Sequence, residues 1–307
     1  MEFIFSVILA FVTAFVLGTL YRRWREKRAL GHPLQLAKSK RLMVDGVQIH
    51  YIQEGRGHDL LLVHGIGASK FCWRLIFQKL TANYRVTAID LPGFGDSEKN
   101  PDLDYGLDAQ TDRLAAFVEK LHLNPVHVVG CSMGGAIGLW LAKSYPNLVE
   151  KLCVIAPAAD HRIVWFNTGR ALGFVKFFGK SLTSRYLIEK AYKRVVEKPE
   201  HFTKEVIDEY YRPYEKDKNA PTTFWKAQET LRDKRLPDAL KVLKTPTLVL
   251  YGEKDKQVKR RNIDHLMQAV SHARLALHPK GGHHLMEDEP DFVLNEIESF
   301  FNTTKEM

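Results

Sequence analysis

Ser132 lies in the sequence GCSMG at residues 130–134, and this context could make it a nucleophile. An apolar, strand-like run precedes these residues and an apolar, helix-like run follows them. A serine flanked in this way by small residues between a strand and a helix is typical of a strained turn that exposes the serine side chain. The alternative interpretation is a close-packed strand-to-helix connection with an incidental serine. The choice between the two depends on whether other residues supply a base.

A serine hydroxyl is a weak nucleophile near neutral pH, so it needs a neighbouring base, which in turn needs an orienting carboxylate. Asp255 follows the apolar run TPTLVLYG, and His283 follows the run ARLALHP and a pair of glycines. The order serine, acid, histidine along the chain is the one expected with this type of serine turn. Glu253 and Asp160 remain alternatives for the acid, and His284 remains an alternative for the base.

Two backbone amides are candidates for stabilising an oxyanion. The sequence HGIG at residues 64–67 ends a strand-like run, and the N–H of Ile66 in this turn could point toward the serine. We expect it to act with the N–H of Met133, the residue directly after Ser132. His64 itself is expected to have a structural role.

Apolar, β-rich runs alternate with longer helix-like segments through most of the chain, which predicts a mostly parallel sheet with helices on both faces. The strand-like runs are VQIHYIQEG, DLLLVHGIG, YRVTAID, NPVHVVG, KLCVIAP, TPTLVLYG and ARLALHP, and the helix-like runs are RLIFQKLTAN, LDAQTDRLAAFVEKLHL, MGGAIGLWLAKSYP and PDFVLNEIESFF. Because each candidate catalytic residue follows a strand-like run, the side chains could converge at one edge of the sheet.

The alternation stops between residues 158 and 244, where the chain is helical in character and rich in aromatic and basic residues. We interpret this stretch as a helical cap over the carboxyl edge of the sheet. The core would then consist of residues 42–157 and 245–307. The cap aromatics are expected to pack internally or to face lipid; they are Trp165, Phe166, Phe174, Phe177 and Phe178.

The N-terminal segment predicts a membrane anchor at residues 1–28, followed by a linker at residues 29–41. Residues 3–21 carry no charge, and a helix of that length spans about the 30 Å of a hydrocarbon core. The alternative, a cleavable signal peptide, is disfavoured because Glu2 stands where a base is usual and no small-residue cleavage site follows. The basic cluster after the run predicts a single-pass protein with its catalytic domain on the cytoplasmic side.

The net charge of +9 does not indicate nucleic-acid binding, because most of the excess positive charge is confined to one segment beside the N-terminal apolar run. Residues 22–41 hold eight Lys or Arg and a single acid. The three cysteines form no CxxC pair, so neither a disulfide framework nor a zinc ribbon is predicted. No nucleotide-binding loop or metal-ligand motif is present in the sequence, and no cofactor is expected.

Five sequence motifs together resemble those of the α/β-hydrolase family over residues 42–303. They are HGIG with a tryptophan seven residues after its isoleucine, DLPGFGDS, GCSMGG, GEKD and GGHHLMEDEP, in the order of the family. The resemblance implies that Ser132 is the nucleophile, His283 the base and then the acid, and Asp255 its orienting partner. The anchored and capped arrangement is similar to membrane-bound esterases and members like monoacylglycerol lipase.

This resemblance implies hydrolysis of a carboxylic ester, with a lipid or another apolar ester as the expected substrate. Thioester, amide and carbon–carbon bond hydrolysis use the same three residues and stay open, as does a non-catalytic binding protein on this fold. Epoxide and haloalkane hydrolysis are disfavoured, because those members use an aspartate nucleophile. The sequence departs from the family at Asp288, where many members have Glu, and at His284, which duplicates the imidazole.

Overall fold

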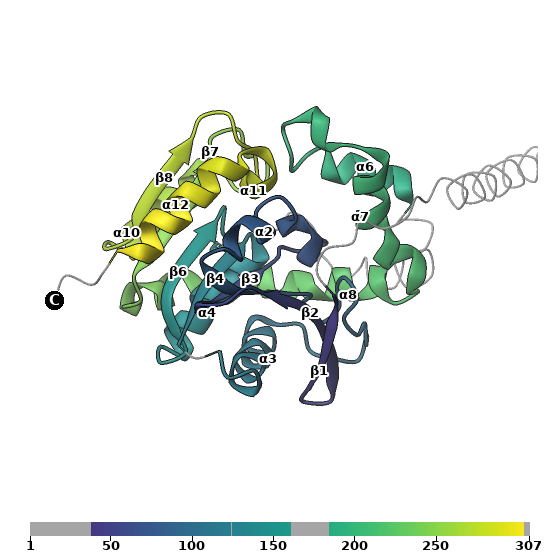
Figure 1. Ribbon diagram of the computed structural model, residues 1–307, viewed down its shortest axis with the longest axis horizontal. Helices are drawn as coiled ribbons and strands as arrows, with labels where there is room; N and C mark the ends of the chain where they lie inside the picture. Colours follow the sequence, from purple (N-terminus) through teal and green to yellow (C-terminus); the bar gives the residue numbers. More distant parts are fainter. Residues whose placement is uncertain (1–37, 124, 161–183, 304–307) are drawn as a thin grey trace, which may run out of the picture.

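The computed structural model describes residues 38–123, 125–160 and 184–303. Within them, an eight-stranded sheet has the strand order β1-β2-β4-β3-β5-β6-β7-β8 (Figure 1). The strands are β1 (Lys40–Val44), β2 (Val47–Glu54), β3 (His58–Val63), β4 (Tyr84–Ile89), β5 (Val126–Cys131), β6 (Val149–Ile155), β7 (Thr247–Gly252) and β8 (Arg274–His278). Pairing is antiparallel for β1 with β2 and for β2 with β4, and parallel from β4 to β8. The prediction of a mostly parallel sheet is confirmed.

Helices cover both faces of the sheet because successive side chains of each strand point to opposite faces. On β3, Leu61 and Val63 contribute to a core cluster shared with α3 (Leu107–Lys120), α4 (Met133–Ser144) and α10 (Arg260–Ala269). Leu60 and Leu62 contribute to the opposite cluster, shared with α2 (Phe77–Leu80) and α12 (Pro290–Asn302). All four β3 side chains are fully buried. The strand is therefore apolar throughout, as expected when both faces are covered.

The described chain between β6 and β7 is helical. It forms the helices α6 (Arg185–Tyr192), α7 (Lys204–Lys216), α8 (Ala220–Lys226) and α9 (Leu236–Ala239) with the short 3-10 turns η3 (Pro199–His201), η4 (Ala227–Arg232) and η5 (Leu240–Val242). Helices α6, α7 and α8 lie together beside the sheet in Figure 1. In contrast, η4, α9 and η5 contribute leucines to the same core cluster as α3 and α4. The final part of the predicted cap thus packs with the core helices.

Two further sequence expectations meet the described residues only in part. Strand β1 begins at Lys40, so it takes in the last two residues of the predicted linker. The predicted anchor at residues 1–28 and the five cap aromatics lie outside the described residues. Within the described ranges, no helix has both the length and the apolar character needed to cross a bilayer.

Candidate active site

Ser132 lies on the tight turn that joins β5 to α4. Its backbone has φ 53° and ψ −114°, a left-handed conformation that costs a residue with a side chain about 1–3 kcal/mol. Hydrogen bonds hold the turn: the Ser132 N–H donates to the Ile155 carbonyl at 3.0 Å, and the Ser132 carbonyl accepts from Ala158 and Ala136 at 3.0 and 3.1 Å. The conformation is the strained type that a nucleophilic serine on a strand–turn–helix connection adopts.

Glycines make this turn possible because they allow close backbone approach. A Cβ at Gly130 would lie 2.4 Å from the Gly134 carbonyl oxygen, and a Cβ at Gly134 would lie 2.3 Å from the Val63 carbonyl oxygen. Neither gap accommodates a methyl group, so α4 can start directly against the end of β3 only with glycine at these positions. The small residues of the GCSMG sequence therefore have a packing reason of their own.

His283 and Asp255 meet at the same edge of the sheet, after β8 and β7 respectively. The His283 Nδ1 lies 2.8 Å from Asp255 Oδ2, and both side chains are buried. The other carboxylate oxygen, Oδ1, accepts from the amides of Gln257 and Val258 at 2.7 and 3.0 Å. These amides fix the carboxylate, so the carboxylate in turn fixes the orientation of the imidazole.

The two alternative acids have other neighbours. A carboxylate oxygen of Glu253 lies 3.8 Å from Arg260, and its side chain is about half exposed. The Asp160 carboxylate lies 3.6 Å from the His265 ring. Among the three candidate acids, only Asp255 has a hydrogen bond to His283 in the described part of the chain.

The loop that carries His283 lies beside the Ser132 turn. The Sγ atom of Cys131, the residue before the serine, is 4.0 Å from the His283 carbonyl oxygen. Ser132 is itself only 6% exposed, and its Oγ forms no hydrogen bond with any residue in the described ranges. The structure thus brings the three predicted residues to one edge, with the imidazole bonded to the carboxylate and not to the serine hydroxyl.

The HGIG turn lies directly against Ser132. A Cβ at Gly65 would be 3.0 Å from Ser132 Cβ and 3.7 Å from its Oγ, so the next residue in this turn, Ile66, is also near the serine. Met133 is the first residue of α4, where a helix leaves its N–H groups without intrahelical partners. Neither the Ile66 nor the Met133 N–H donates a hydrogen bond within the described residues. Both residues therefore lie close to Ser132 and have amide groups that are not used by other described residues.

His64 has both ring nitrogens in use. Its Nδ1 lies 2.7 Å from the Gly65 carbonyl oxygen, and the Leu91 N–H donates to its Nε2 at 3.0 Å. Burial lowers the pKa of His64, although Asp90 opposes this effect. A neutral imidazole that bridges two loops in this way agrees with the structural role expected from the sequence.

His284 is held by a buried carboxylate that the sequence analysis did not single out. Its Nδ1 lies 2.6 Å from Glu287 Oε2, and its ring stacks on that of His283 with centroids 5.8 Å apart. Glu287 is fully buried and also accepts hydrogen bonds from Arg74, from Tyr192 of α6 and, at 2.9 Å, from Tyr210 of α7. His284 thus belongs to a network that joins the helices between β6 and β7 to the His283 loop.

The charge on Glu287 persists despite its burial. Desolvation by burial acts to raise its pKa, but the Arg74 guanidinium and the hydrogen bond from His284 outweigh it and lower the pKa to about 2. A carboxylate without these partners would be neutral at this depth. The only sequence sign of this network was the acidic residue three positions after His284 in the run HHLMEDEP.

Asp288, noted in the sequence as a departure from the family, supports the same loop. Its carboxylate accepts from the Gly282 amide at 2.7 Å and from the amides of Glu197 and Lys198 at 2.8 and 3.1 Å. Gly282 directly precedes His283, and the other two residues follow α6. Asp288 therefore fixes the His283 loop to the chain that leaves α6.

Residues 90–97 form a second polar connection to α7. The Ser97 hydroxyl donates to the Asp90 carbonyl at 2.6 Å, so the two residues stabilise this turn. Lys70 pairs with the Asp90 carboxylate and lies 3.0 Å from Asp96, and Arg212 of α7 also pairs with Asp96. Helix α7 is therefore held to the core by ion pairs here and by the hydrogen bond from Tyr210, two residues earlier in the helix, to Glu287.

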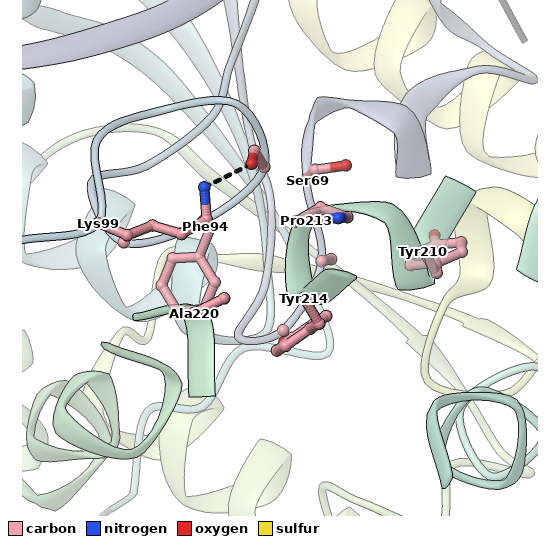
Figure 2. Close-up of a pocket in the computed structure, with 11 residues that line it drawn as sticks. Ser69, Phe94, Lys99, Tyr210, Pro213, Tyr214 and Ala220 are labelled. Carbon is pink, nitrogen blue, oxygen red and sulfur yellow. Dashed lines mark hydrogen bonds between the residues drawn. The ribbon is translucent and has the colours of Figure 1, made fainter. Parts of the chain in front are cut away.

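A small cavity lies between α7 and the loops that follow β3 and β4. Its volume is about 10 Å³, roughly the space of one water molecule. Figure 2 shows Tyr210 and Tyr214 of α7 facing Phe94 and Lys99 across it, with the ammonium group of Lys99 bonded to the Gly95 carbonyl at 2.7 Å. A larger, more open hollow of about 690 Å³ adjoins it beside β1 and α7. Neither Ser132 nor His283 lines these two cavities.

The strand order and the serine turn define an α/β hydrolase. Residues 60–296 match the model of the Alpha/beta hydrolase family, and the chain belongs to that family. Human monoacylglycerol lipase ABHD6 is 27% identical over 324 residues, covering 96% of this chain and 92% of the relative. A 2-hydroxy-6-oxo-6-(2'-aminophenyl)hexa-2,4-dienoic acid hydrolase of Metapseudomonas resinovorans is 27% identical over 273 residues, covering 84% of this chain and 88% of the relative.

A crystal structure of a membrane phospholipase A, described as a bacterial virulence factor, has a TM-score of 0.72 and 22% identity. It covers 98% of each chain. At this identity the likeness concerns the fold. Lipases and an esterase are among the sequence relatives.

Proposed function

We propose that this protein is a serine hydrolase that cleaves carboxylic esters through an acyl-enzyme on Ser132. The observation that carries the proposal is the 2.8 Å contact between His283 Nδ1 and Asp255 Oδ2, beside the strained turn that presents Ser132. An imidazole whose Nδ1–H donates to a carboxylate has its Nε2 lone pair available as a base. A serine nucleophile requires a general base of this kind.

The reaction would proceed in two half-reactions. Ser132 Oγ attacks the ester carbonyl while His283 Nε2 accepts its proton, and the oxyanion receives hydrogen bonds from the Ile66 and Met133 amides. The tetrahedral intermediate collapses, and His283 protonates the departing alcohol. Water then attacks the acyl-enzyme with His283 again as the base. His283 then returns this proton to Ser132 Oγ as the bond to the acyl group breaks, and the carboxylic acid is released.

The substrate we propose is a lipid ester or another apolar ester. Support comes from the predicted anchor at residues 1–28, which would hold the catalytic domain at a membrane surface, on its cytoplasmic side, and from the relative named as a monoacylglycerol lipase. The relative named as a dienoic acid hydrolase favours a second candidate, because the substrate in its name contains no ester. Hydrolysis of a carbon–carbon bond by the same residues is therefore the alternative function.

Labelling with a fluorophosphonate probe tests whether Ser132 is the nucleophile. The wild-type protein is expected to bind the probe covalently, because the probe mimics an acyl group and traps an activated serine. The Ser132→Ala variant is expected to remain unlabelled, and a Ser144→Ala variant at the far end of α4 provides a matched control. Equal labelling of wild-type and Ser132→Ala protein would contradict the enzyme proposal and favour a non-catalytic binding protein.

A series of p-nitrophenyl esters with increasing acyl length tests the substrate class. We expect kcat/KM to rise from acetyl to medium and long acyl chains, because apolar chains gain about 0.8 kcal/mol for each buried CH₂. Detergent micelles are expected to increase the rates with long chains, as for an enzyme that takes its substrate from an interface. A marked preference for short, water-soluble esters would argue against a lipid substrate. Turnover of a dienoic acid but of no ester would favour the alternative function.

A further inference from the structure

Three potential metal ligands come together at the edge of the sheet opposite the serine turn. His58 begins β3, His127 is the second residue of β5 and Glu150 is the second residue of β6. The three strands are neighbours in parallel register, so their amino ends lie side by side. Ser132, Asp255 and His283 all follow the carboxyl ends of strands, which places this cluster away from the proposed active site.

The spacing of the three side chains fits a single metal ion. One ligand atom from each residue lies within 4.8 Å of those of the other two. The His58 Nε2 and Glu150 Oε2 are 3.1 Å apart, and the rings of His58 and His127 have centroids 4.0 Å apart with an interplanar angle of 37°. Tetrahedral zinc bonds of about 2.0–2.2 Å to imidazole nitrogen and carboxylate oxygen place the ligand atoms about 3.3–3.6 Å apart. This separation lies between the 3.1 Å contact and the 4.8 Å limit of the cluster.

His127 is the fixed member of the cluster. It is 4% exposed and stacks on Phe301 of α12, with ring centroids 4.4 Å apart. Its Nδ1 is buried and has no hydrogen-bond partner within the described residues, which costs about 1–3 kcal/mol for a polar atom.

The other two side chains make the cluster accessible. The His58 and Glu150 side chains are 39% and 35% exposed, so an ion can reach them from solvent and both can adjust their rotamers around it. The carboxylate would balance part of the charge of a divalent ion. A rigid buried imidazole with two adjustable ligands at the surface is an arrangement that can close around a metal without a change of fold.

We propose that His58, His127 and Glu150 form a Zn²⁺ site that stabilises the amino edge of the sheet. Two imidazoles and one carboxylate are a ligand set that zinc uses together with a water molecule in the fourth position. The sequence contains no metal-binding motif because the ligands come from three separate strands. The site is independent of the proposed ester hydrolysis, and its occupancy is expected to change stability without a change in the reaction.

Zinc titration of the full-length protein without a polyhistidine tag tests this site. After treatment with a chelator, the wild-type protein is expected to bind one Zn²⁺ per chain by calorimetry and to show a higher melting temperature with Zn²⁺, because an ion that binds only the folded state stabilises it. The variants His58→Ala and Glu150→Gln alter partly exposed side chains and are expected to bind Zn²⁺ about tenfold or more weakly.

Two further variants make the result specific. His127→Phe retains an aromatic ring against Phe301 and removes both nitrogens, and it is expected to lose the zinc-dependent rise in melting temperature. His265 lies near the Asp160 carboxylate but does not belong to the cluster of three ligands. The His265→Ala variant is therefore expected to bind Zn²⁺ as the wild type does. The proposal is wrong if the wild type shows no saturable binding of one ion, or if His58→Ala and Glu150→Gln bind as tightly as the wild type.

Discussion

A His283→Ala enzyme is expected to hydrolyse its best p-nitrophenyl ester with a kcat about 10⁴- to 10⁶-fold below that of the wild type. Without the imidazole, no group removes the proton from Ser132 and none protonates the departing alcohol. The backbone amides near Ser132 would still stabilise an oxyanion, so a small residual rate above the uncatalysed reaction is expected. Steady-state kinetics, with circular dichroism to verify the fold, provide the measurement.

The matched control for this variant is His284→Gln. His284 is the neighbouring imidazole, but its Nδ1 contacts Glu287 and its ring packs against His283. A glutamine amide can still donate to Glu287, so we expect kcat to fall by less than about tenfold, the cost of roughly one weakened hydrogen bond. The reverse order, with His284→Gln nearly inactive and His283→Ala active, would assign the base to His284.

Much of this arrangement could be predicted from the sequence because each proposed catalytic residue follows a strand-like run. An alternation of apolar runs and helices implies parallel strands, and parallel strands end at one edge of the sheet. Ser132, Asp255 and His283 each follow such a run, so their approach needs no knowledge of individual contacts. The order of residues in the sequence leaves three acids as candidates for the partner of His283. The 2.8 Å distance from His283 Nδ1 to Asp255 Oδ2 favours Asp255 among them.

The polar networks around the site could not be predicted, because their partners are remote in sequence. Arg74 and Glu287 are separated by 213 positions, and no periodic pattern relates them. In the sequence HHLMEDEP, Glu287 resembles a residue of an exposed acidic turn, yet its side chain is fully buried. Only the folded structure shows that Tyr192 and Tyr210 reach it from α6 and α7.

Glu287→Gln is expected to lower the free energy of unfolding by about 3–5 kcal/mol, as when one partner of a buried ion pair is removed. The Arg74 side chain is 8% exposed and would keep its charge without the carboxylate. The amide would also place two hydrogens among groups that donate, since His284, Tyr192 and Tyr210 all direct hydrogen bonds toward this position. Urea unfolding of the full-length protein at pH 7, followed by tryptophan fluorescence, measures the loss.

Two controls separate the buried pair from a general effect of charge. Asp291→Asn alters a carboxylate that pairs with Lys79 at the surface, where both side chains are more than half exposed, and it is expected to change stability far less. The double variant Arg74→Met with Glu287→Gln removes the uncompensated charge and is expected to recover part of the loss. A Glu287→Gln variant as stable as Asp291→Asn would contradict the role of this ion pair.

The pH dependence of this difference follows from the pKa of Glu287, which the folded state lowers from 4.5 to about 2. A carboxyl group with a lowered pKa contributes stability above its unfolded pKa, and this contribution is lost as the pH falls toward the folded value. The gap between wild type and Glu287→Gln should therefore be constant from pH 7 to about 5 and narrow from pH 4.5 downward. Urea midpoints at pH 7, 5, 4 and 3 measure it. A gap that stays unchanged down to pH 3 would mean that the charge of Glu287 does not hold α6 and α7 to the His283 loop.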